Sequence, residues 1–129
     1  MRPRLDVLGV VAAGGVAGTL ARHAATVVLG ASPLVTFAVN VVGCLLIGVL
    51  TGLMNQVWAG RLLRPFLGTG VLGGFTTFSG YAIDAQQLLA AGRFVVAVVY
   101  VGGTVVSALV AVSIGTALTR ASIIARMRV

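Results

Sequence analysis

The sequence contains no lysine and no glutamate, and its only acidic residues are Asp6 and Asp84. Cys44 is its single cysteine and His23 its single histidine, so a disulfide framework and a cluster of thiolate or imidazole metal ligands are both excluded. Cys44 lies inside an apolar run, where we interpret it as a packing residue. An enzyme active site is not expected, because no nucleophile, base or metal cluster accompanies the histidine.

What the sequence has in abundance is apolar surface. Apolar residues make up 59% of the 129-residue chain, whereas charged residues make up only 9%. A soluble domain of this size has too little interior to hide that much apolar surface from water. The net charge of +7 comes from arginines at the ends of apolar runs, not from one basic face, which argues against nucleic-acid binding. The composition predicts an integral membrane protein.

Four apolar segments are long enough to cross the hydrocarbon core of a bilayer, which takes about 20 helical residues. They cover residues 7–29, 34–57, 65–90 and 94–118. Barrel strands would alternate polar and apolar residues, and these segments do not. We therefore predict an all-α integral membrane fold of four transmembrane helices, with residues 1–129 forming a single transmembrane domain.

Small residues recur four positions apart in each segment. The pairs are Gly14 with Gly18, Gly48 with Gly52, Gly70 with Gly74, and Gly103 with Ser107. Small side chains allow helix backbones to approach closely in lipid, so the pairs predict a tightly packed bundle. The alternative is the ordinary enrichment of glycine in membrane helices.

The arginines are divided unequally between the two membrane surfaces. Four crossings place both termini and the middle connection on one surface, which carries Arg2, Arg4, Arg61, Arg64, Arg120, Arg126 and Arg128. The opposite surface carries Arg93 and, near the end of the first segment, Arg22. Because positively charged connections stay in the cytoplasm, this excess predicts a multi-pass protein with both termini cytoplasmic.

The third segment is too rich in glycine and hydroxyl groups to be an unbroken, lipid-facing helix between Gly68 and Tyr81. We predict a break between Gly73 and Ser79. Broken backbone at membrane depth is tolerated inside protein or along a water-filled cavity, where the ends of the half-helices present carbonyls and amides to ions. The alternative is a glycine kink whose hydroxyls bond back to the preceding turn.

Other polar and aromatic side chains lie within the apolar segments. Asn40 has a carboxamide that must find a partner, and its NH₂ group can either donate to an anion or bridge two helices. Phe78 and Tyr81 fall on one helical face, where their positive ring edges can meet an anion or simply pack in the core. Tyr100 and Thr104 are one turn apart and can face the same polar track.

Three stretches resemble the signature stretches of the Fluc/CrcB family of small fluoride ion channels. They are Gly14-Gly-Val-Ala-Gly-Thr-Leu-Ala-Arg-His23, Val39-Asn-Val-Val-Gly43 with Gly48, and Gly70-Val-Leu-Gly-Gly-Phe-Thr-Thr-Phe-Ser79, in the family's order. The resemblance implies a passive fluoride-selective channel in the bacterial cell membrane, which exports cytoplasmic fluoride and lowers its toxicity. It also implies an antiparallel, dual-topology dimer with two pores along the subunit interface and a structural sodium ion (Na⁺) at its centre.

The resemblance also implies roles for individual residues. The implied fluoride path is lined by Asn40, Phe78, Tyr81, Tyr100 and Thr104, with Thr77 and Ser79 as neighbouring hydroxyl donors. Arg22 matches an arginine near a vestibule, and Asp84 matches an acidic position after the break. The backbone carbonyls of Gly73 and Thr76 would hold the sodium ion. Fluoride is tightly hydrated, so such donors must replace its lost water without trapping it.

Two departures from the family pattern leave the assembly open. Tyr81 stands where the family usually has a second phenylalanine, which could alter or silence one pore. The arginine excess is also unlike a homodimer that inserts equally in both orientations. The partner is therefore either a second copy or a related, oppositely oriented subunit, in which case this chain could itself be a non-conducting partner.

A small proton-coupled multidrug-type transporter is the closest competing function. Such transporters depend on a membrane-buried glutamate in the first helix, and this chain has none.

Overall fold

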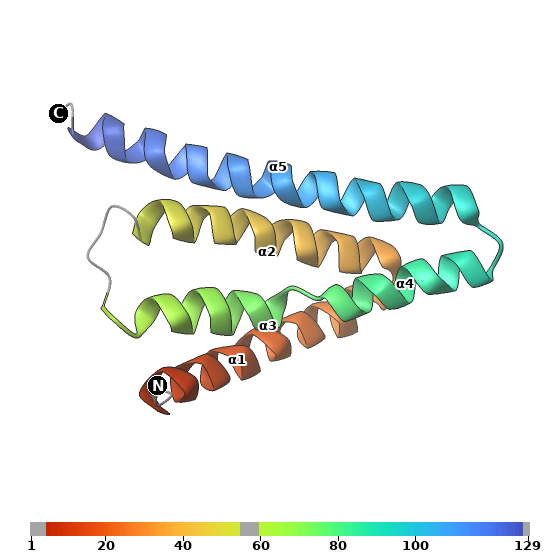
Figure 1. The fold of residues 1–129 in the computed structure, drawn as a ribbon, viewed down its shortest axis with the longest axis horizontal. Helices are drawn as coiled ribbons and strands as arrows, with labels where there is room; N and C mark the ends of the chain where they lie inside the picture. The colour runs from red at the N-terminus through yellow and green to blue at the C-terminus, as the bar shows by residue number, and fades with distance from the viewer. Residues whose placement is uncertain (1–4, 55–59, 128–129) are drawn as a thin grey trace.

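The computed structural model describes residues 5–54 and 60–127, which form an all-helical bundle (Figure 1). Its elements are α1 (Leu5–Leu29), α2 (Pro33–Met54), η1 (Pro65–Leu72), α3 (Gly73–Phe75), α4 (Phe78–Ala90) and α5 (Phe94–Met127). No strand occurs among the described residues. The all-α prediction is therefore confirmed.

Three helices are long and apolar enough to cross a membrane: α1, α2 and the Phe94–Ala125 part of α5. The remaining predicted crossing, residues 65–90, is divided among η1, α3 and α4. Large apolar side chains are exposed on the long helices, for example Val28 at 79% and Phe94 at 64%. This surface requires lipid or protein around it, because water would not solvate it favourably.

The predicted bounds of the first two helices agree closely with the structure, although residues 55–57 lie outside the described residues. Gly30 and Gly92 adopt φ values of 89° and 70° at the ends of α1 and α4, and this left-handed conformation favours glycine. The last helix is longer than predicted. It has 34 residues, or about 51 Å at about 1.5 Å per residue, which exceeds a hydrocarbon core of about 30 Å.

The bundle contains two tightly packed helix pairs. In the first, α1 lies against η1 and α3, at the bottom of Figure 1. A Cβ atom added to Gly14 would collide with the backbone carbonyl of Phe66, and one added to Gly18 would collide with that of Val71. The two backbones approach this closely only because the α1 residues lack side chains.

The second pair is α2 with α5. A Cβ at Gly48 would collide with the carbonyl of Val112, and one at Gly52 would meet the Thr119 side chain. Gly103, by contrast, faces no atom of the described chain within 4 Å, so the predicted Gly103 pair does not mediate packing inside this subunit. Gly115 takes that role on α5, where an added Cβ would collide with the carbonyl of Leu45.

The start of α1, the end of α2, the start of η1 and the end of α5 lie at the same end of the bundle (Figure 1). Arg61 forms an ion pair with Asp6, which joins the turn before η1 to the first turn of α1. Both side chains are substantially exposed, so the pair contributes little stability. The pair shows that the turn before η1 lies beside the first turn of α1.

Candidate functional site

The third apolar segment, residues 65–90, is interrupted at two threonines. Thr76 (φ −74°, ψ 156°) and Thr77 (φ −141°, ψ 118°) are extended, between the end of α3 at Phe75 and the start of α4 at Phe78. The predicted break is thus confirmed. The preceding η1 segment is a π-helix, in which the amide of Gly73 donates to the carbonyl of Gly68 five residues earlier.

Local hydrogen bonds hold the break in place. The Thr76 amide and hydroxyl both donate to the carbonyl of Leu72 at 3.0 Å, which closes the first half-helix. Thr77 is the N-cap of α4, because its Oγ1 accepts a hydrogen bond from the Gly80 amide at 3.0 Å. The same residue types that predicted a break from the sequence therefore supply the two caps.

Asn40 connects α2 to the break. Its Oδ1 accepts from the Thr77 amide at 2.8 Å and its Nδ2 donates to the Thr77 carbonyl at 3.0 Å. The side chain is 8% exposed, and Gly43 one turn later leaves room for the Thr76 side chain against α2. A carboxamide carries two N–H donors, so one remains after the bond to Thr77. Asn40 can thus bridge two elements and still donate to an anion.

The break removes the helical partners of two carbonyls. In a continuous α-helix, Thr77 N would donate to Gly73 O and Gly80 N to Thr76 O. Here Thr77 N donates to Asn40 and Gly80 N donates to the Thr77 hydroxyl. The carbonyls of Gly73 and Thr76, which the sequence predicted as sodium ligands, are therefore released from the helical pattern and can serve a cation.

Arg22 lies beside the break. Its Nε donates to the carbonyl of Gly74 at 3.3 Å, and the Thr19 hydroxyl, one turn earlier on α1, donates to the same oxygen at 3.4 Å. Arg22 thus satisfies a third carbonyl at the end of the half-helix. Sequence reasoning did not find Thr19; its only signal was the spacing of three residues from Arg22, which places both on one helical face.

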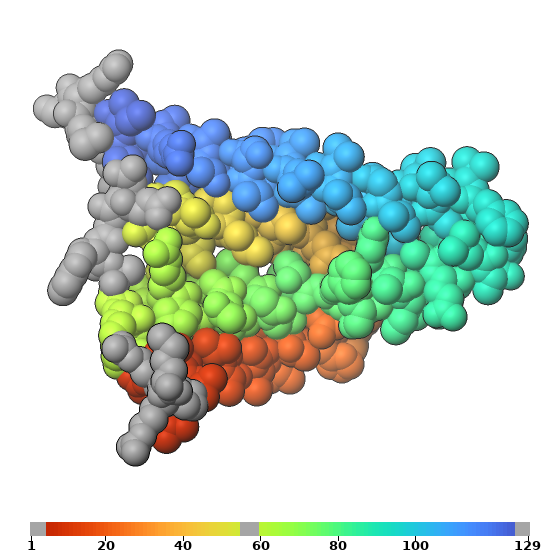
Figure 2. Space-filling view, viewed as in Figure 1, coloured from red at the N-terminus to blue at the C-terminus, as the bar shows by residue number. Residues whose placement is uncertain are grey.

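A cavity of about 270 Å³ opens next to the break. Its lining consists of Asn40, Cys44, Ile47, Thr76, Thr77, Phe78, Tyr81, Thr104, Val105 and Ala108. The lining comes from α2, the break, the start of α4 and α5, and Figure 2 shows the molecule hollowed between α2 (yellow) and the green segment that leads to the break. Most of the predicted pore residues therefore share one cavity, and Ser79, Tyr100 and Arg22 are not part of its lining. Cys44, interpreted above as a packing residue, lies one turn beyond Asn40 on the cavity wall.

The aromatic side chains form a row across α4 and α5. The ring centroids of Phe78 and Tyr81 are 5.7 Å apart, and those of Tyr81 and Tyr100 are 5.6 Å apart. Phe78 is 81% exposed in the isolated chain. The Tyr81 hydroxyl donates to the carbonyl of Val101 at 3.3 Å, so its polar end is held against α5.

The hydroxyl groups of the other predicted pore residues have hydrogen-bond partners within this chain. The Tyr100 hydroxyl donates to Asp84 at 3.2 Å, and Thr104 donates to the Tyr100 carbonyl at 2.6 Å. Tyr100 and Thr104 therefore do not direct their hydroxyls to a shared track in this chain. Ser79 is exposed, with its Oγ 3.3 Å from the Thr77 hydroxyl.

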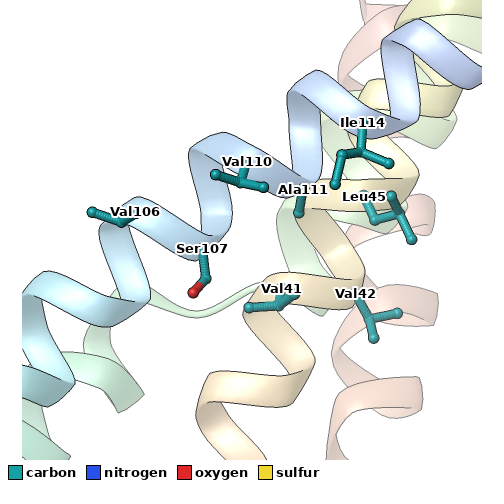
Figure 3. A pocket seen from close by; sticks show the side chains of 8 residues that line it. All are labelled: Val41, Val42, Leu45, Val106, Ser107, Val110, Ala111 and Ile114. Carbon is teal, nitrogen blue, oxygen red and sulfur yellow. The ribbon is translucent and has the colours of Figure 1, made fainter.

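A larger groove, of about 440 Å³, lies between α2 and α5 (Figure 3). Val41 and Leu45 line it from α2, and Val106 and Val110 from α5, with Ser107 as the one polar side chain. A hydrated anion would lose its water there without gaining donors. The described residues also contain no group of three metal-binding His, Cys, Asp or Glu side chains, so a bound cation would depend on carbonyl oxygens.

Comparison with known proteins adds an independent observation. The family model for CrcB-like protein, Camphor Resistance (CrcB), matches residues 9–116, which include every candidate site residue. The chain belongs to the CrcB family. It is 48% identical over 116 residues to fluoride-specific ion channel FluC 1 of Streptomyces coelicolor, covering 86% of this chain and 75% of that protein.

Two further relatives of the CrcB chain carry similar names. FluC 2 of Nocardia farcinica, a fluoride-specific ion channel, is 44% identical over 125 residues, covering 92% of this chain and 89% of the relative. FluC of Paracoccus denitrificans, also a fluoride-specific ion channel, is 43% identical over 114 residues, covering 85% and 91%. The resemblance predicted from the three sequence stretches is confirmed.

Proposed function

We propose that this chain is a subunit of a passive, fluoride-selective channel in the cell membrane, which exports cytoplasmic fluoride and lowers its toxicity. One observation carries the proposal: Asn40, Thr77, Phe78, Tyr81 and Thr104 line a single cavity beside a break in a membrane helix. The relatives named above are fluoride-specific ion channels, which favours an ion channel over an enzyme or a proton-coupled exporter.

Fluoride binds its hydration water strongly, so the cavity must replace that water with hydrogen-bond donors. The second N–H of Asn40 is one donor, and the Thr77 hydroxyl, whose oxygen already accepts from Gly80, has its own proton to give. The edges of the Phe78 and Tyr81 rings add weak positive potential. Arginine is absent from this lining, so the sites hold the ion weakly enough for it to move on.

In this proposal a sodium ion is held by the carbonyls of Gly73 and Thr76, which the break releases from the helical pattern. It would supply positive charge to carbonyl dipoles that have lost their helical donors, and would thereby stabilise the break. The expected result is a higher melting temperature in sodium than in N-methylglucamine buffer, equivalent to about 2.7 kcal/mol at about 100 times the dissociation constant. Potassium at the same ionic strength is the control, and identical melting in all three salts would contradict a sodium site.

The active assembly in this proposal is an antiparallel dimer. Phe78 is 81% exposed and borders the cavity, so a second subunit placed against the break would cover the ring and complete the wall. The second subunit is either another copy or a related protein in the opposite orientation. The two cases differ in whether this chain conducts alone.

Fluoride efflux from liposomes containing the purified protein, alone or co-expressed with an oppositely oriented relative, tests the function, with chloride efflux as the selectivity control. Asn40→Asp keeps the acceptor for the Thr77 amide but replaces the Nδ2 donor with negative charge. Fluoride efflux should fall at least about tenfold, which corresponds to about 1.4 kcal/mol. Unchanged efflux in Asn40→Asp would remove Asn40 from the fluoride path.

The matched control is Gln86→Glu, which makes the same change from amide to acid on an exposed face of α4. It should leave efflux unaltered. Equal losses in both variants would assign the effect to added charge in general rather than to the cavity. The absence of fluoride efflux from the unmodified chain, when it is reconstituted alone, would favour a non-conducting partner subunit.

A further inference from the structure

A second cavity, of about 330 Å³, lies between the last turns of α2 and the beginning of η1. Its lining consists of Ile47, Leu50, Thr51, Met54, Arg64, Gly68 and Thr69. Unlike the groove of Figure 3, it contains a cationic side chain and two hydroxyls. It lies at the end of the bundle where α2 ends and η1 begins (Figure 1).

The two cavities adjoin along one face of α2. Asn40, Cys44 and Ile47 line the cavity at the break, and Ile47, Thr51 and Met54 line the second one. These positions are three or four residues apart, which places them on a single stripe of the helix. Asn40 and Thr51 are separated by eleven residues, or about 16 Å along the axis. Ile47 is the residue that the two linings share.

The chemistry differs between the two ends of this stripe. Arg64 is an exposed side chain in the lining of the second cavity, and it carries a permanent positive charge. Thr51 and Thr69 add neutral hydrogen-bond donors to the same lining. A cationic cleft raises the local concentration of anions and the rate at which they enter. The Ile47 side chain offers no donor, so an anion passing it must give up water before it reaches Asn40.

We propose that the cavity lined by Arg64, Thr51 and Thr69 is an entry site for small inorganic anions, which leads past Ile47 to Asn40. The inference rests on the proposed fluoride channel and adds a binding site outside the break, with Ile47 as the apolar barrier between the two. Arg64 acts by concentrating the ion, and Ile47 limits its passage.

Fluoride efflux from liposomes of low and high ionic strength tests the role of Arg64. At about 0.01 M salt the screening length is about 30 Å, and at about 1 M it is about 3 Å. Arg64→Gln should reduce efflux several-fold at low salt and little at high salt. Arg64→Lys preserves the charge and should restore efflux at low salt, which separates the electrostatic role from any effect on folding.

Arg120→Gln is the matched control. Arg120 is an exposed arginine on α5, next to the Thr119 that packs on Gly52 near the end of α2, and it lines neither cavity. Equal effects of Arg64→Gln and Arg120→Gln on fluoride efflux would contradict the proposed entry site. A loss of efflux in Arg64→Gln that does not depend on salt would contradict it as well. Inactivity of the unmodified protein, both alone and together with an oppositely oriented relative, would instead overturn the proposed function, so the two failures are distinguishable.

Ile47→Phe tests the barrier, because a larger apolar side chain between the cavities should lower efflux several-fold at both salt concentrations. Leu46→Phe makes a comparable change one residue away, at a side chain that is 45% exposed and lines neither cavity. Normal efflux in Ile47→Phe, or an equal loss in Leu46→Phe, would show that the ion does not pass Ile47.

Discussion

Asn40 shows why a polar residue inside a membrane helix is difficult to interpret alone. From the sequence, bridging two helices and donating to an anion were alternatives. In the structure, the carboxamide pairs with both backbone groups of Thr77 and lies in the wall of the cavity. The two hydrogen bonds to Thr77 fix the direction of the remaining N–H, because a side chain held at two points has little freedom to rotate. The two roles therefore support each other.

Tyr81 is the residue at which this chain departs from the family pattern, and the structure bears on what the departure does. Its hydroxyl donates to the carbonyl of Val101 instead of entering the cavity, while its ring lies 5.7 Å from that of Phe78. Tyr81→Phe should therefore conduct within about twofold of the unmodified chain, because it keeps the ring and removes only a hydrogen bond to a residue outside the cavity lining. Fluoride efflux from liposomes measures this.

A variant without the ring provides the contrast. Tyr81→Ile removes the aromatic edge as well as the hydroxyl, and we expect efflux to fall at least about tenfold if that edge contacts the ion. A large increase in efflux in Tyr81→Phe would show that the hydroxyl obstructs the path, which is the silencing effect considered from the sequence. Normal efflux in Tyr81→Ile would place the ring outside the path.

At the level of the helices, hydropathy alone was enough to locate α1, α2 and the start of α5. The broken third segment was also predictable, because glycines and threonines are poor formers of a continuous lipid-facing helix. The π-helical geometry of η1 was not, since it depends on which carbonyl each amide reaches in the packed structure. The extension of α5 beyond residue 118 was missed because helical hydrogen bonds continue after the apolar run ends.

The site was only partly predictable for a similar reason. Residue type and spacing identified Asn40, Phe78 and Thr104, and the structure brings these into one cavity. Spacing alone also placed the Tyr100 and Thr104 hydroxyls together, but the first donates to Asp84. The direction of a hydroxyl group depends on neighbouring residues from other helices, and the residue spacing within a single helix does not reveal those neighbours.

Packing between α1 and η1 yields a prediction about stability. A Cβ atom at Gly18 would collide with the carbonyl of Val71 and come within 2.8 Å of the Phe75 amide nitrogen, and backbone atoms cannot move aside cheaply. Gly18→Ala should therefore lower the free energy of unfolding by about 1–3 kcal/mol, despite the better helix propensity of alanine. Unfolding in mixed detergent micelles measures the change.

Gly9 is the control on the same helix, because an added Cβ there meets no atom of the described chain within 4 Å. Gly9→Ala should be neutral or stabilising by up to about 1 kcal/mol. If Gly18→Ala were as stable as Gly9→Ala, the close approach of α1 to η1 would not exist in the membrane. The effect on Gly18 is expected without any change in the cavity lining, so residual efflux per folded protein should be normal.

For the whole molecule, the main question is which way the chain faces. Arg61 and Arg64, which come directly before η1, lie at the end of the bundle where α2 ends, and the ion pair between Arg61 and Asp6 joins the turn before η1 to the first turn of α1. Arg93 lies at the opposite end, between α4 and α5. The arginines that the structure describes thus agree with the charge bias predicted from the sequence, and the positive-inside rule acts on such a bias during insertion.

We expect most copies to insert with the end that carries Arg61 in the cytoplasm, so that an antiparallel dimer requires a related partner of opposite orientation. Single cysteines at Gly60→Cys and Ala91→Cys, in a Cys44→Ala background, report the two ends, because both positions are exposed. A membrane-impermeant maleimide applied to intact cells should label position 91 and leave position 60 unlabelled until the membrane is opened.

Differently tagged copies of the chain complete the test, since a subunit with one orientation cannot form antiparallel dimers with itself. Under this expectation the two tags do not co-purify, and fluoride efflux requires co-expression of the oppositely oriented relative. Equal labelling of positions 60 and 91, together with co-purification and efflux from this chain alone, would instead establish a dual-topology homodimer. The arginine excess would then be too weak to decide orientation.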